Sequence, residues 1–142
     1  MTDFAGELET AARIAREAAV LVRSYHRKHL VIESKAGNEP VTEADRAANA
    51  FIVERLAAAF PRDVILSEEI PDTGARLGQP RVWMVDPIDG TSDFILGDTG
   101  FVVMIGLAID GRPTVGAVAH PLSEKVYGGI VGPMAADRKS VV

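Results

Sequence analysis

The sequence contains no cysteine and no apolar run long enough to cross a membrane. Without cysteine there is no disulfide, no thiolate metal ligand and no cysteine nucleophile, so any metal must be held by oxygen or histidine. The longest apolar runs, such as 102–109, fall well short of the roughly 20 residues that a spanning helix needs. The N-terminus also lacks a basic segment followed by an apolar one, so the sequence predicts a cytoplasmic protein that does not enter the membrane.

Positive charge is in short supply as well. Fifteen Lys and Arg residues stand against twenty Asp and Glu, which gives a net charge of −5. This balance disfavours nonspecific binding to nucleic acid and offers no large attractive field for a phosphate. A protein of this charge that handles an anionic substrate would need cations as mediators. Its 142 residues, 47% of them hydrophobic, suit one globular domain, so we take residues 1–142 as a single domain.

Two amphipathic helices are expected in the first part of the chain. Residues 4–28 carry apolar side chains at helical spacing and end in a basic cluster, which complements the dipole at a helix C-terminus. A second helix is expected over residues 44–60. Thr42 stands three residues before Asp45, a pattern that resembles a capping box with Asp in place of Glu.

Short apolar runs separated by turn residues predict a sheet after these helices. Strands are expected at 31–34, 64–67, 81–85, 101–109, 113–120 and 125–131, with loops at 35–40 and 71–80. The almost wholly apolar run 101–109 predicts a central strand buried on both faces, and Asp110-Gly111 predicts a hairpin turn. The fold class is therefore α/β, of the layered α+β type, with two N-terminal helices packed on a largely antiparallel sheet.

Three carboxylates, Glu68, Asp86 and Asp89, lie at the ends of predicted strands or in the turns just after them. Side chains in such places can converge at one edge of a sheet, where like charges repel unless cations lie between them. Hard oxygen ligands suit Mg²⁺, and the rigid turn between the two aspartates can also offer the Ile88 carbonyl. The sequence therefore predicts a two-metal site.

Gly90 and Thr91 follow directly, where the chain turns into a short helical segment. Free N–H groups at a helix start can hold a phosphate, and glycine lets the backbone approach it closely. The Thr91 hydroxyl can hydrogen-bond the attacking water, and Asp45 can accept the Thr91 proton if its helix packs against this turn. Taken singly, Asp-Gly is a turn signal and paired glutamates are usually solvated, but together these residues favour attack on phosphorus by metal-activated water.

Three ordered motifs resemble those of the inositol monophosphatase family. They are WMVDPIDGTSDF at 83–94, LSEE at 66–69 and PVTEAD at 40–45. The resemblance extends from the first helix to about Gly132. It implies a layered fold and a Mg²⁺-dependent phosphoric monoester hydrolase, with several Li⁺-inhibited and many homodimeric members, acting on a small phosphorylated metabolite.

The resemblance also implies roles for individual residues. Metal ligands would be Glu68, Asp86, the Ile88 carbonyl and Asp89. Thr91, Asp45 and Glu68 would be catalytic, and Gly90, Thr91 and Asp89 would bind the substrate.

The substrate stays open among inositol monophosphate, histidinol phosphate and 3′-phosphoadenosine 5′-phosphate. The LSEE motif and Phe94-Ile95 favour a bisphosphate nucleotidase, whereas Pro87-Ile88 and residues 106–108 also suit the other two phosphatases. The family carries a further metal-binding Asp in a C-terminal Trp-Asp motif that this sequence does not contain. The alternative is therefore an inactive N-terminal fragment that keeps the scaffold and binds cations weakly, with 133–142 as a non-native tail.

Overall fold

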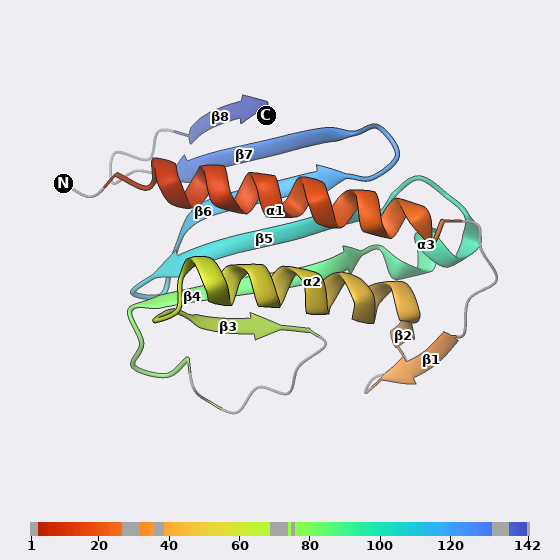
Figure 1. Ribbon diagram of the computed structural model, residues 1–142, viewed down its shortest axis with the longest axis horizontal. Coiled ribbons are helices and arrows are strands. Elements are labelled where there is room, and N and C mark those ends of the chain that lie inside the picture. The colour runs from red at the N-terminus through yellow and green to blue at the C-terminus, as the bar shows by residue number, and fades with distance from the viewer. Residues whose placement is uncertain are drawn as a thin grey trace.

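The computed structural model describes residues 3–26, 32–35, 39–68, 74, 76–131 and 137–141. Helices and strands follow one another along the chain as shown in Figure 1. The elements are α1 (Ala5–Ser24), β1 (Ile32–Lys35), β2 (Glu39–Thr42), α2 (Glu43–Ala59), β3 (Val64–Ser67), β4 (Arg81–Asp89), α3 (Thr91–Leu96), β5 (Val102–Ile109), β6 (Arg112–His120), β7 (Lys125–Val131) and β8 (Asp137–Val141).

Six of the described strands form one sheet in the order β3-β4-β5-β6-β7-β8, so neighbours in the sheet are also neighbours along the chain. The β3–β4 pair is parallel and the later pairs are antiparallel. The strands β1 and β2 form a separate antiparallel pair. The predicted fold class, with a largely antiparallel sheet, is therefore confirmed.

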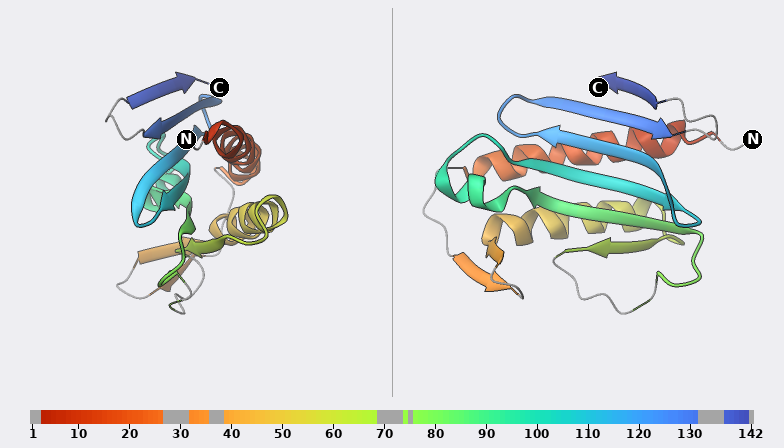
Figure 2. Two further views of the ribbon diagram at one scale, coloured as in Figure 1. Left: turned by 90° about the vertical axis from the view of Figure 1, so that its left-hand side faces the viewer. Right: turned by 180° about the vertical axis from the view of Figure 1, so that it is seen from behind.

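Helices α1 and α2 lie side by side on one face of the sheet (Figure 2). Helix α1 packs over β5, β6 and β7, and α2 packs over β3 and β4. The buried face of α1 consists mainly of small side chains: Ala11, Ala12, Ile14, Ala15, Ala18, Ala19 and Val22. Small side chains let the helix approach closely, and a Cβ added at Gly128 of β7 would lie only 2.7 Å from Leu8 Cδ1. No helix among the described residues is long and apolar enough to span a membrane.

The opposite face of the sheet carries exposed apolar side chains, and the prediction that 101–109 is buried on both faces is wrong. Within β5, Val103, Ile105 and Leu107 are buried beneath the helices, whereas Met104 is 39% exposed. Met84 of β4 is 42% exposed. The reason is that an antiparallel sheet can be covered on one face only, so each strand alternates between two environments.

Other boundaries differ from the expected ones by a few residues. Helix α1 ends at Ser24 with basic Arg23 in its last turn, whereas Arg27, Lys28 and His29 lie outside the described residues. The expected loop 35–40 is wrong at both ends, because Lys35 belongs to β1 and pairs with Glu39 of β2. The capping box at Thr42 is confirmed.

Two sequence predictions fall wholly or partly outside the described part of the chain. Within the predicted flexible loop 71–80, residues 71–73 and 75 are not described. Residues 137–141 pair antiparallel with β7 as β8. That residues 133–142 form a non-native tail stays a prediction.

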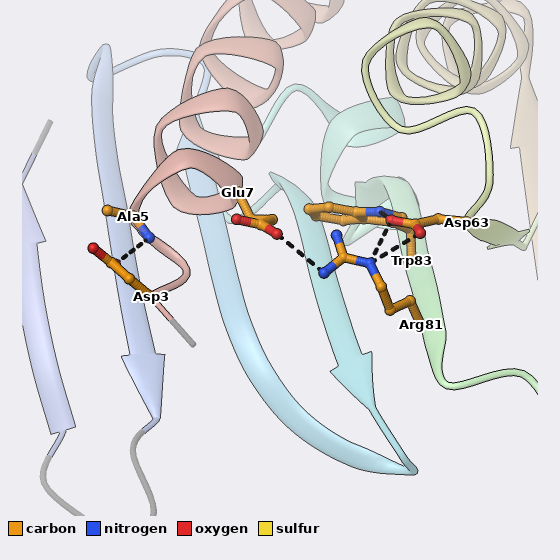
Figure 3. Close-up of polar contacts among 6 residues, drawn as sticks. All are labelled: Asp3, Ala5, Glu7, Asp63, Arg81 and Trp83. Atoms are coloured by element: carbon orange, nitrogen blue, oxygen red, sulfur yellow. Dashed lines mark hydrogen bonds and ion pairs between the residues drawn. The ribbon is translucent and has the colours of Figure 1, made fainter. Parts of the chain in front are cut away.

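A polar cluster joins α1, the turn before β3, and the start of β4 (Figure 3). The Asp63 carboxylate accepts hydrogen bonds from Arg81 Nε at 2.9 and 3.0 Å and from Trp83 Nε1 at 2.9 Å. Arg81 Nη1 also lies 3.0 Å from Glu7 Oε2. The hydrogen bond to Asp63 is the main cause of the raised pKa of Arg81, which burial opposes and Glu7 supports. The cluster fixes the end of β4 farthest from Asp89.

We expect Asp63→Ala to lower the free energy of unfolding by about 2–4 kcal/mol, because it leaves Arg81 Nε and the Trp83 N–H without their acceptor. Chemical denaturation measures this change. The control is Glu124→Gln, which breaks an exposed pair with Arg23 and should cost less than about 1 kcal/mol. Equal losses in the two variants would contradict the importance assigned to the cluster.

Candidate active site

The Asp45 carboxylate lies at the start of α2 and is 1% exposed. Its Oδ2 accepts hydrogen bonds from the Thr42 N–H at 2.8 Å and the Thr42 hydroxyl at 2.7 Å. Its Oδ1 lies 3.1 Å from the Thr91 hydroxyl, at the start of α3. A buried carboxylate needs such partners, since an unpaired charge would be expensive to keep there. The structure thus brings Asp45 and Thr91 together from positions 46 residues apart.

The Thr91 hydroxyl has a second acceptor, the Ile88 carbonyl, at 3.0 Å. A hydroxyl carries one proton, so Thr91 can donate to Asp45 or to Ile88 but not fully to both. The backbone here is shaped by a β-bulge. Asp86 pairs with Met104 and Asp89 with Val102, so β4 advances three residues where β5 advances two. The bulge re-aims the side chains that follow Asp86.

Gly90 makes the turn between β4 and α3 and has a φ of +90°. A Cβ at this position would lie 2.6 Å from the Gly100 carbonyl oxygen. A side chain is therefore excluded both by the left-handed backbone and by the neighbouring loop. This constraint sets the position of Thr91 directly after it.

Glu68 follows β3, and its N–H donates to the Val85 carbonyl of β4 at 3.4 Å. The preceding residue, Ser67, donates its hydroxyl proton to Asn49 Oδ1. Asn49 lies one helical turn after Asp45 on α2. Helix α2 therefore contacts the end of β3 through one residue and the start of α3 through another.

Glu68, Asp86 and Asp89 line a single cavity of about 650 Å³. The remaining wall is mostly apolar and belongs to the uncovered face of the sheet, with Met84 and Met104 prominent. No Lys, Arg or His is among the described residues of the lining. The three carboxylates therefore make the described lining of the cavity acidic.

These carboxylates suit a hard divalent cation by their chemistry, because all their donor atoms are oxygens. Asp86 is half-buried, whereas Glu68 and Asp89 are exposed. Within the described ranges, no group of three or more acidic or histidine side chains is gathered tightly enough to form a ready metal cage. The donors fit Mg²⁺, but the exposed pair would have to move inward around it.

The predicted site residues thus form two adjoining groups. The carboxylates Glu68, Asp86 and Asp89 surround the cavity, whereas Ile88, Gly90, Thr91 and Asp45 are not among its lining residues. Asp89 connects the groups, since it lines the cavity and directly precedes the Gly90 turn. Sequence reasoning missed the Asn49–Ser67 contact, although the four-residue spacing from Asp45 places Asn49 on the same helix face.

The model of the inositol monophosphatase family matches residues 6–136, and the chain belongs to this family. The chain is 37% identical to a histidinol-phosphatase of Chlorobaculum parvum, over 85% of this chain and 46% of that protein. It is 34% identical to a 3′(2′),5′-bisphosphate nucleotidase, CysQ, of Aggregatibacter actinomycetemcomitans, over 84% of this chain and 45% of the relative.

Among solved structures, an IMPase of Thermotoga maritima superposes with a TM-score of 0.84 and 26% sequence identity. The match covers 95% of this chain and 51% of that one. The chain therefore spans about half the length of the curated relatives and solved structures it matches.

We expect Gly90→Ala to lower the free energy of unfolding by at least about 3 kcal/mol, through the left-handed φ and the clash with Gly100. Gly97→Ala is the matched control. Gly97 also has a positive φ, +78°, but a Cβ there would meet nothing within 4 Å. It should cost only about 1 kcal/mol. Thermal unfolding of both variants would show whether the close contact matters beyond backbone strain, and equal losses would show that it does not.

Proposed function

We propose that this chain forms the metal- and phosphate-binding half of a Mg²⁺-dependent hydrolase of small phosphomonoesters. The observation that supports it most is the cavity lined by Glu68, Asp86 and Asp89, the last of which lies two residues before Thr91, the hydrogen-bond partner of Asp45. Three carboxylates that line one cavity make it acidic, and bound metal cations would let such a cavity attract an anionic substrate. The family membership favours the same activity.

In this proposal Glu68, Asp86, Asp89 and the Ile88 carbonyl hold Mg²⁺. When bound, the cations would activate water and neutralise charge that develops on the phosphate. The apolar wall of the cavity leaves one side for the non-phosphate part of a substrate.

The chain's own residues then orient the substrate and move a proton. Backbone N–H groups at Gly90 and Thr91 bind phosphate oxygens, with Asp89 at the same turn. Thr91 accepts a hydrogen bond from the attacking water while its own proton is directed to Asp45 Oδ1, 3.1 Å away. Glu68, across the cavity, supplies a second acceptor for a proton of the water.

The substrate class comprises inositol monophosphate, histidinol phosphate and 3′-phosphoadenosine 5′-phosphate. Matched relatives carry the names of a histidinol-phosphatase and a bisphosphate nucleotidase, and the family takes its name from inositol monophosphate. The motifs at 66–69 and 83–95 point to different members of this class, so we rank the three substrates nearly equal. We place the reaction in the cytoplasm and the working form as a homodimer.

A second candidate function is a catalytically inactive scaffold that binds cations weakly. It is favoured by the absence of a closed acidic cage among the described residues. Weak cation binding follows if the exposed Glu68 and Asp89 must reorganise around each ion.

Phosphate release from the three substrates, with Mg²⁺ and with a chelator, distinguishes the two candidates. Activity that needs Mg²⁺ and falls with Li⁺ supports the hydrolase. Mg²⁺-dependent thermal stabilisation without phosphate release supports the scaffold. If Mg²⁺ neither raises the unfolding temperature nor permits phosphate release, both proposals fail.

We expect Asp86→Asn to lower kcat by at least about 10², because the substitution removes charge where the cations and the transition state need it. The same change should abolish any stabilisation by Mg²⁺. Asp98→Asn is the control, since Asp98 is an exposed carboxylate beyond α3 and outside the cavity lining. Steady-state phosphate release measures both variants, and activity of Asp86→Asn within about threefold of the wild type would contradict the assignment.

A further inference from the structure

Thr42 is fully buried and does more than cap α2. In a capping box, the N-cap hydroxyl accepts from the backbone N–H three residues on, and the side chain there returns to the N-cap N–H. Both bonds are present here, but the Asp45 N–H is 3.4 Å from the Thr42 hydroxyl. That hydroxyl lies much closer, at 2.7 Å, to Asp45 Oδ2. Its proton is therefore directed to the carboxylate.

The two oxygens of Asp45 consequently have different partners. Oδ2 receives two hydrogen bonds, both from Thr42, and Oδ1 faces Thr91. Rotation of the carboxylate would break both bonds to Thr42 in a site that is 1% exposed. Because water has little access there, the broken bonds would not be replaced.

We propose that Thr42 is a positioning residue that holds Asp45 Oδ1 toward the Thr91 hydroxyl. The consequence for catalysis rests on the proposed function, but the positioning itself does not. Without the Thr42 hydroxyl, the Asp45 carboxylate keeps only one hydrogen bond at Oδ2 and can turn. The Thr91 proton then moves to its other acceptor, the Ile88 carbonyl at 3.0 Å.

Three variants separate positioning from ordinary capping. Thr42→Ser keeps a hydroxyl that can donate to Asp45, whereas Thr42→Val keeps the shape and removes it. Thr114→Val is the matched control, because Thr114 is also buried and its hydroxyl donates to the Arg112 carbonyl at 3.0 Å, away from the site. Any general effect of removing a buried threonine hydroxyl should appear in both valine variants.

The first measurement needs no activity and uses this chain. Three-bond NMR couplings report the χ1 rotamer of Asp45, the side chain that the Thr42 hydroxyl is proposed to hold. We expect one rotamer in the wild type, Thr42→Ser and Thr114→Val, and averaging between rotamers in Thr42→Val. A single unchanged Asp45 rotamer in folded Thr42→Val overturns the proposal.

Asp45→Asn gives a second measurement that does not depend on the folding of Thr42→Val. If Thr42 donates two hydrogen bonds to one side of residue 45, the amide oxygen of the substituted side chain must face Thr42. Its NH₂ group must then face Thr91. Nuclear Overhauser contacts from that NH₂ to the Thr91 methyl support the proposal, and contacts to the Thr42 methyl instead overturn it.

Where phosphate release is observed, kinetics gives a third test. We expect Thr42→Val to lower kcat about 10–100-fold with KM within about twofold, and Thr42→Ser to restore kcat to within about threefold of the wild type. In the Asp45→Asn background, Thr42→Val should add less than about threefold, because Thr42 acts through Asp45. Unchanged kcat in Thr42→Val, or a full additive loss, overturns the proposal. Absence of phosphate release from the wild type counts against the proposed function alone, and the NMR measurements still decide the role of Thr42.

Discussion

The carboxylate of Asp45 is buried, and its burial constrains much of the site. An ionised group withdrawn from water must be surrounded by donors, and here the donors come from the end of β2 and the start of α3. The start of α2 adds the favourable field of a helix N-terminus. The end of one strand and the starts of two helices therefore have to meet at one carboxylate. Any backbone shift that separates these elements also leaves the buried carboxylate without its hydrogen-bond donors. Their relative positions are therefore held more tightly than apolar packing alone would achieve.

Helix α2 transmits this constraint to the rest of the site. Its first turn contacts Thr91 through Asp45. Its second turn contacts the end of β3 through Asn49, which accepts a hydrogen bond from Ser67, the residue before Glu68. The β-bulge after Asp86 and the left-handed turn at Gly90 then bring the β4 residues beside those contacts. The acidic cavity lies on the sheet face away from α2. The site thus combines a rigid, hydrogen-bonded side beneath the helix with an open, charged side above the sheet.

The sequence predicted most of the elements because their local signals were strong. The 3.6-residue spacing of alanines, the Thr42 capping box and the Asp110-Gly111 turn each have a local physical cause. The length of β4 was not predicted, because Pro87 and the Asp-Gly pair indicate a turn, whereas pairing with β5 carries the strand to Asp89. Strand β5 is buried on one face because helices cover only that face of the sheet. The local sequence of β5 does not show which elements will cover it. The nearness of Asp45 to Thr91 followed from a condition on helix packing that only the tertiary structure could test. The exposure of Glu68 and Asp89 likewise depends on the tertiary structure around them, which the spacing of the carboxylates does not reveal.

The strand order along the sheet has a consequence for how the chain folds during synthesis. Every strand from β4 to β8 joins an edge made by its predecessor, so each pairing closes only a short loop. Helix α1 is made before β5, β6 and β7, the strands against which its alanine-rich face is mainly buried. On the ribosome the part of that face that these strands cover stays exposed while about a hundred residues are added, a matter of roughly 5–20 seconds at usual elongation rates. Alanine side chains expose little apolar area, so this face has a low tendency to aggregate before the strands are made. The small side chains that let α1 pack closely on the finished sheet therefore also protect it during synthesis.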